Sequence, residues 1–209
     1  MSPGFKRPIL RDSSHFEWVQ GSADPAVTYR LTHDSAWALL SRVRAGVDAE
    51  TVHRVIDVVD TQGIDDIAQL WAGAPSRSLA GVLWRLYLVQ QAVHVNAAET
   101  TQTFRAGFEQ TRSTAAVLVG VPNPAEPENI STLIHDVLHG VFIGDFEDAL
   151  HRASAFCTIM SLGSVAIANE RDAHDRAHAE QLTKRALRYS RFAEDFTLAA
   201  KLWSTGSLP

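Results

Sequence analysis

The feature that most constrains the fold is a long segment near the C-terminal end, Arg171 to Trp203, which contains neither glycine nor proline. Within it, apolar residues recur with alternating spacings of four and three positions. They are Leu182, Ala186, Tyr189, Ala193, Phe196, Ala200 and Trp203. This is the heptad spacing of a helix that packs lengthwise against another helix. The segment therefore predicts a long amphipathic helix and, with it, a helical bundle.

The rest of the chain also has helical periodicity, which predicts an all-α fold. The most apolar stretch, Leu79 to Val95, contains Arg85, Gln90 and His94. It is too short and too polar for a membrane span, and its composition suits a buried helix. We therefore predict a single compact bundle of about seven or eight helices packed around this central helix, with no membrane contact.

Capping residues indicate where several of these helices begin. Asp24 followed by proline is a good start for a helix, because proline suits the first helical turn. Asn96 with Glu99 three residues later resembles a capping box. Asp145, with an acidic residue soon after it, is a further N-cap before the segment that starts at Phe146.

Length and composition predict one domain. At 209 residues, 45% hydrophobic and 21% charged, the chain can bury a core without disulfides or metal ions. Residues 1–24 lack periodicity and contain several prolines and glycines, so they are expected to form a flexible N-terminal arm. The all-helical domain is expected over residues 25–209. A proline-rich linker, VPNPAEPEN, interrupts it near residues 121–129.

Charge and cysteine content bear on location and partners. A net charge of −5 provides no overall electrostatic attraction for nucleic acid. A single cysteine excludes an internal disulfide and fits a reducing compartment. No stretch of the N-terminal residues is apolar enough for a signal peptide. We therefore predict a soluble, cytoplasmic protein whose overall charge does not favour nucleic acid as a partner.

The segment from Ile130 to Cys157 is rich in histidine but reads as two amphipathic helices. One helical face carries apolar residues, namely Ile130, Leu133, Ile134, Val137, Leu138 and Val141. His135 and His139 fall on the opposite face, where we expect solvent. Cys157 lies in the apolar stripe of the second helix. We predict a buried core cysteine rather than a nucleophile.

The heptad pattern breaks at the start of the C-terminal helix. Extended backward from Leu182, it meets His178, Asp175 and Arg171, with His174 on the flank. The first turns of the helix could project past the core into water, or Asp175 and Arg171 could pair with each other. Alternatively, His174, Asp175 and His178 could bind a divalent metal ion or a small anion, because two histidines four residues apart on a helix are a workable ligand pair.

The far part of the same helix suggests self-association. Leu187, Leu198 and Leu202 lie opposite the heptad seam, and a helix that is apolar on two sides requires two partners. One partner is its own core, and the other is expected to be a second copy of the chain. We therefore predict a homodimer through the C-terminal helix.

Two segments, LAGVLWRLYLVQQAV and GDFEDALHRASAFC, resemble those of a family of uncharacterised, mostly helical actinobacterial proteins. The resemblance covers most of residues 25–165 and consists of core helices rather than a catalytic motif. It implies an all-α cytoplasmic protein without a known activity. No functional residue is carried over from it.

Three functions remain open from the sequence. The leading one is a non-catalytic interaction protein that self-associates and has a further, unknown protein partner. The second is a metal- or ligand-binding helical protein, with hydrolase as its candidate activity, that uses His174, Asp175 and His178, with no other cofactor expected. The third is a nucleic-acid-associated regulator, which would use the N-terminal arm, made basic by Lys6, Arg7 and Arg11, together with a basic cluster. That cluster comprises Lys184, Arg185, Arg188 and Arg191. No phosphate-binding loop, dinucleotide fingerprint or nucleophile elbow is present.

Overall fold

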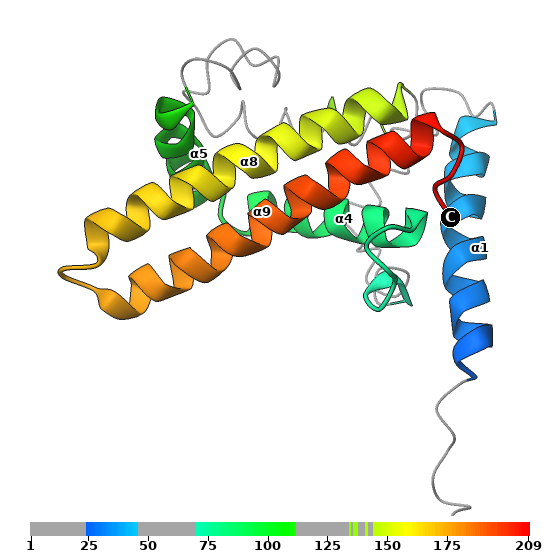
Figure 1. Ribbon diagram of the computed structural model, residues 1–209, viewed down its shortest axis with the longest axis horizontal. Helices are drawn as coiled ribbons and strands as arrows, with labels where there is room; N and C mark the ends of the chain where they lie inside the picture. The colour runs from blue at the N-terminus through cyan, green and yellow to red at the C-terminus, as the bar shows by residue number, and fades with distance from the viewer. Residues whose placement is uncertain (1–23, 46–69, 112–133, 135, 138–140, 142–143) are drawn as a thin grey trace, which may run out of the picture.

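The computed structural model describes residues 24–45, 70–111, 134, 136–137, 141 and 144–209 (Figure 1). In this part the protein is all-helical, as predicted. The helices are α1 (Pro25–Arg44), α4 (Leu79–Val95), α5 (Ala97–Gln110), α8 (Phe146–Arg171) and α9 (Arg176–Ser204). The predicted number of helices and the central position of the Leu79–Val95 helix are not supported. Most of the predicted arm and the linker near 121–129 lie outside the described residues.

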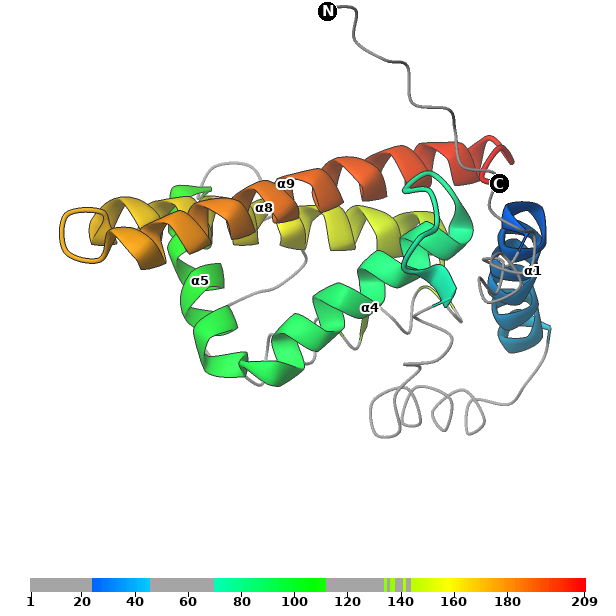
Figure 2. The ribbon, with the colours of Figure 1, turned by 90° about the horizontal axis from the view of Figure 1, so that it is seen from below.

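Two long antiparallel helices, α8 and α9, lie side by side and form the spine of the molecule (Figures 1 and 2). The predicted heptad seam of α9 is confirmed: six of its seven residues are buried, and Trp203 is half-buried against the same core. Small polar residues of α8 complete the contact. The Ser154 hydroxyl donates to the Ala193 carbonyl oxygen at 2.9 Å, and the Ser161 hydroxyl donates to that of Ala186 at 2.9 Å. These bonds define the level at which the two helices face each other.

The prediction that one helix runs from Arg171 to Trp203 was wrong at its start. Helix α8 ends at Arg171, the chain reverses, and α9 begins at Arg176. The Asp175 carboxylate accepts a hydrogen bond from the His178 backbone N–H at 3.1 Å. An aspartate at this position satisfies one of the unpaired N–H groups of a new helix. The polar residues around it have no apolar surface to bury, so nothing favours a continuous helix there.

Helix α5 crosses α8 at a contact between two glycines. A Cβ atom on Gly107 would lie 1.9 Å from the Ile159 carbonyl oxygen, and one on Gly163 would lie 1.8 Å from that of Thr103. Neither glycine can therefore be replaced without moving a backbone. The buried hydroxyls next to the two glycines bond within their own helices, Thr103 to the Glu99 carbonyl oxygen at 2.8 Å and Ser164 to that of Met160 at 2.7 Å. Because these groups are small and satisfied, the two helix backbones approach closely.

Helix α4 runs obliquely beside the α8–α9 pair, and α5 turns back from its end toward α8 (Figure 2). Its predicted range, Leu79–Val95, is confirmed, and Ser78 caps it by accepting the Gly81 N–H at 3.2 Å. Arg85 connects α4 to α9, donating from Nε to Asp195 at 2.7 Å. The Asn96–Glu99 capping box at the start of α5 is also confirmed, with the Glu99 N–H donating to Asn96 at 3.1 Å.

Helix α1 lies across the end of the hairpin where α8 begins and α9 ends (Figure 1). The Trp37 ring stacks on Trp203 with centroids 6.0 Å apart, and Trp203 contacts Phe146 at 4.4 Å. Arg44 lies over the last two rings, and its guanidinium donates to the carbonyl oxygens of Val141 and Gly144. Partial burial there lowers the pKa of Arg44. An aromatic and cationic cluster therefore joins three segments that are far apart in sequence.

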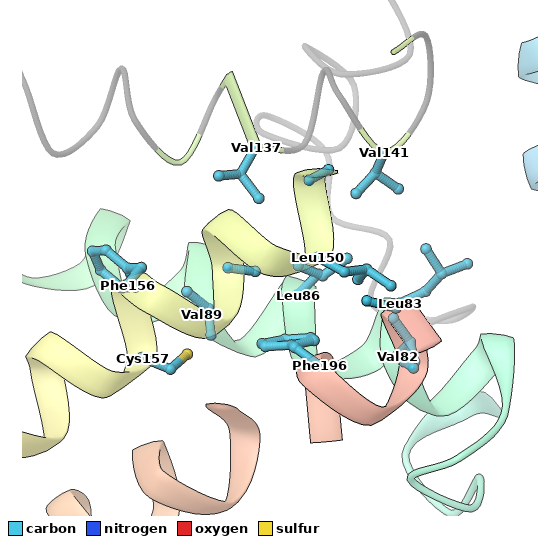
Figure 3. Packing of buried hydrophobic residues seen from close by; sticks show 14 of the residues in the cluster. Val82, Leu83, Leu86, Val89, Val137, Val141, Leu150, Phe156, Cys157 and Phe196 are labelled. Atoms are coloured by element: carbon cyan, nitrogen blue, oxygen red, sulfur yellow. The ribbon is translucent and has the colours of Figure 1, made fainter. Parts of the chain in front are cut away.

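The main core lies between α4, α8 and α9 (Figure 3). Leu86 and Val89 of α4 point toward Leu150 of α8 and Phe196 of α9 (Figure 3). The predicted apolar face near residue 134 is confirmed where it is described. Ile134, Val137 and Val141 are buried there, whereas Asp136 is exposed. His135 and His139 lie outside the described residues.

One helix in the described part of the chain, α8, is long and apolar enough to cross a membrane by length and composition. Its 18-residue window has a mean hydropathy of 1.2, and 44% of the window is buried inside the protein. The sequence predicted a helix here, but only the stretch 79–95 was considered there as a possible membrane span. Core helices of soluble proteins pass the same test, so no location follows from it.

Candidate functional site

The three predicted metal ligands lie at the tip of the α8–α9 hairpin. His174 and Asp175 are exposed in the turn, and His178 is half-buried in the first turn of α9. The Asp175 carboxylate caps α9. Within the described ranges, no group of three His, Cys, Asp or Glu side chains is arranged to hold a metal ion. The metal site stays a prediction, to which this geometry adds nothing.

The break in the heptad pattern has a simpler explanation. Near the tip, a small core cluster comprises Ile167, Ala168, Ala179 and Leu182. The residues between Ala168 and His178 are exposed. The hairpin tip therefore projects past the core, as one of the two sequence interpretations expected.

The basic cluster on α9 is partly neutralised by its own fold. Lys184 pairs with Glu180 at 2.7 Å, and Arg185 pairs with Glu99 of α5. Arg188 and Arg191 are exposed, and no carboxylate in the described residues pairs with either. Because two of the four basic side chains already pair with carboxylates, the cluster is a weak binding surface for a polyanion. Phosphate binding depends on cations that are not paired within the protein.

Cys157 is confirmed as a core residue. Its side chain is fully buried in the main core, where it points toward α9 (Figure 3). Burial raises the pKa of the Cys157 thiol far above its ordinary value. Because the thiolate is the reactive form, this cysteine is not a nucleophile in the folded protein.

This burial predicts that the protein becomes less stable in alkali. Above roughly pH 8.5 an unfolded cysteine loses its proton, whereas folded Cys157 retains it. Deprotonation then favours the unfolded state, and stability falls by about 1.4 kcal/mol for each further pH unit. Urea titrations between pH 8 and pH 10 measure this slope. Cys157→Ala should lack it, although burial also raises the pKa of Tyr189, which adds its own slope at higher pH.

In the described part of the chain, the outer face of the α8–α9 hairpin, on the side away from α4 and α5, has apolar side chains that remain exposed to solvent. On α8 it comprises the half-buried Glu147 and the exposed His151, Thr158, Leu162 and Val165; on α9 its exposed residues include Leu187, Glu194, Thr197 and Lys201. Leu162, Val165 and Leu187 are 38%, 43% and 53% exposed. Surface apolar residues that gather on one face commonly mark an interaction site.

The outer face is hollowed between its two helices. A groove of about 660 Å³ is lined by Glu147 and His151 of α8 and by Leu198 and Lys201 of α9. A second hollow of about 490 Å³ adjoins it near Thr158. A groove between paired helices can accept side chains from another helix, so the outer face has the shape of a packing surface.

The leucines predicted to mediate a dimer are only partly placed as expected. Leu187 is exposed and Leu198 is half-buried in the groove, but Leu202 was placed wrongly, because it packs against the main core. Leu162 and Val165 of α8 were missed. They share heptad spacing with Glu147, His151 and Thr158, a signal that was present in the sequence.

Comparisons with protein-family models, with curated proteins and with solved structures gave no match. The resemblance to a family of actinobacterial helical proteins therefore stays a prediction.

Proposed function

We propose that the chain is a non-catalytic interaction protein that forms a homodimer through the outer face of the α8–α9 hairpin. The observation that carries this proposal is the group of three exposed apolar side chains, Leu162, Val165 and Leu187, on that face. A lone, buried cysteine is compatible with the reducing cytoplasm, where we place the protein.

The register of the hairpin makes the outer face complementary to itself. Ser161 bonds to Ala186, so Leu162 of α8 lies at the level of Leu187 of α9, and Val165 lies about one helical turn nearer the tip of the hairpin. At the end of the hairpin opposite its tip, Glu147 of α8 and Lys201 of α9 line the same groove. The residues of α8 therefore match those of α9 along the hairpin. Near the tip both helices carry apolar residues, and at the other end an acidic residue of α8 matches a basic residue of α9.

A second copy is the partner that uses this arrangement. If a twofold axis runs parallel to the hairpin, α8 of one protomer lies on α9 of its partner at the same level. Leu162 and Val165 then contact the partner's Leu187, and Glu147 contacts the partner's Lys201. Each contact occurs twice, as in any isologous interface. The product is a four-helix bundle in which every helix is antiparallel to its neighbours.

The first experiment measures mass by light scattering and sedimentation over a range of protein concentrations. We expect a dimer at micromolar concentration, and Leu187→Asp should convert it to a monomer, because a buried unpaired charge is costly. Leu31→Asp, on the exposed part of α1, is the matched control and should remain dimeric. A monomeric wild-type protein at every concentration would overturn the proposal.

A charge exchange tests the orientation of the two copies. Glu147→Lys and Lys201→Glu each place like charges opposite one another twice in the dimer. At low salt, we expect each to weaken dimerisation by about tenfold. An equimolar mixture of the two variants should restore association, because each pair again joins opposite charges in the heterodimer. Failure of the mixture to associate would contradict this arrangement of the helices.

A further inference from the structure

A separate cavity of about 370 Å³ lies where the end of α4, the start of α5 and the middle of α9 meet. It lies on the side of α9 that faces α4 and α5, so the outer face of the hairpin does not contribute to it. Its apolar wall includes Leu88, Ala92 and Val95 of α4 and Phe192 of α9. Its volume falls within the range typical of small-molecule sites.

Among the described residues that line this cavity, one cation has no carboxylate partner. Arg185 pairs with Glu99, and Asn96 donates to the other Glu99 oxygen at 2.7 Å. The Glu99 carboxylate is therefore held from both sides. Arg188 lines the same cavity and is exposed, and no carboxylate in the described part of the chain pairs with it. The described lining residues, with two arginines and one glutamate, give the cavity a net charge of one positive unit.

The apolar wall of the cavity includes side chains that remain partly or largely exposed to solvent. Val95 ends α4 and is 81% exposed, and Phe192 is half-buried. Apolar surface gains free energy when it leaves water, at about 25 cal/mol for each Å² buried. A ligand that covers Val95 and Phe192 would provide this burial, while its negative charge would meet Arg188.

We propose that this cavity binds an amphiphilic organic monoanion. Its carboxylate lies against the guanidinium of Arg188, and its hydrocarbon part lies against Val95 and Phe192. Arginine suits this role because its planar guanidinium donates two parallel hydrogen bonds to one carboxylate. The net positive charge of the cavity favours a ligand with one negative charge. Its apolar wall disfavours a small inorganic anion, which has no hydrocarbon part to bury.

Isothermal titration calorimetry of the full chain with octanoate tests this proposal. We expect one saturable site per chain, with octanol, which lacks the charge, and inorganic phosphate, which lacks the tail, binding at least about tenfold more weakly. Arg188→Gln should weaken octanoate binding by at least about tenfold. Arg191→Gln, on the same helix but outside the cavity, should leave it unchanged. Val95→Ser should weaken it severalfold without disturbing the core, because Val95 is exposed.

Three results would overturn the proposal: no saturable binding of octanoate, equal effects of Arg188→Gln and Arg191→Gln, or phosphate binding as tight as octanoate binding. The first means that the cavity is a packing irregularity. The second means that octanoate adsorbs to the protein without using this site. The third means that the arginines attract anions in general.

Discussion

Replacing Gly163 with alanine is expected to lower the free energy of unfolding by about 3 kcal/mol. The added Cβ would lie 1.8 Å from the Thr103 carbonyl oxygen of α5. That oxygen belongs to the backbone, so the clash cannot be relieved by turning a side chain, and α5 must move away from α8. The cost is therefore at the upper end for an overpacked core. Urea unfolding followed by circular dichroism measures it.

Two further glycines make this prediction specific. Gly107→Ala should have a similar effect, because its Cβ would lie 1.9 Å from the Ile159 carbonyl oxygen on the other side of the same crossing. Gly73→Ala is the matched control, since nothing lies within 4 Å of a Cβ at that position. If Gly163→Ala unfolds at the same urea concentration as Gly73→Ala, the close crossing of α5 and α8 is wrong.

Phe196→Ala is expected to cost about 4 kcal/mol, because it removes a large side chain from the centre of the core. Phe196 belongs to the heptad seam of α9 and is fully buried between α4 and α8 (Figure 3). Truncation loses the burial of the ring and leaves a cavity that the surrounding helices cannot fill. The variant should unfold at a much lower urea concentration.

Tyr29→Ala is the matched control for this truncation. It removes an aromatic ring of similar size from α1, where the side chain is 51% exposed. We expect a change below about 1 kcal/mol, since exposed substitutions away from special features are small. Equal losses for Phe196→Ala and Tyr29→Ala would show that α9 does not bury its seam against the core.

The dimer and the anion cavity are independent proposals on opposite sides of α9. Leu187 and Lys201 belong to the outer face, whereas Arg188 and Phe192 line the cavity. Leu187→Asp should therefore abolish dimerisation and leave octanoate binding intact, and Arg188→Gln should do the reverse. The two sets of variants keep failure of one proposal distinguishable from failure of the other.

Several features followed from the sequence because they depend on residues close together in the chain. The seam of α9 was predicted from spacing alone, since burial of one helical face requires only the correct period. The caps at Asp24, Asn96 and Asp145 were predicted because a capping side chain bonds to an N–H two or three residues away. The bounds of α4 and the burial of Cys157 were also predicted from residues close together in the chain.

The remaining features depend on contacts between segments far apart in the chain, and only the tertiary structure decided them. Helical spacing shows that a face is buried but not which helix covers it, so the pairing of α8 with α9 was not predicted. The contact of Gly107 with Gly163 and the pairing of Arg185 with Glu99 depend on how the helices cross. The sequence by itself determined the all-helical class and the apolar faces, through local periodicity and capping. The tertiary structure decided the outer face and the cavity, because both exist only where particular helices meet.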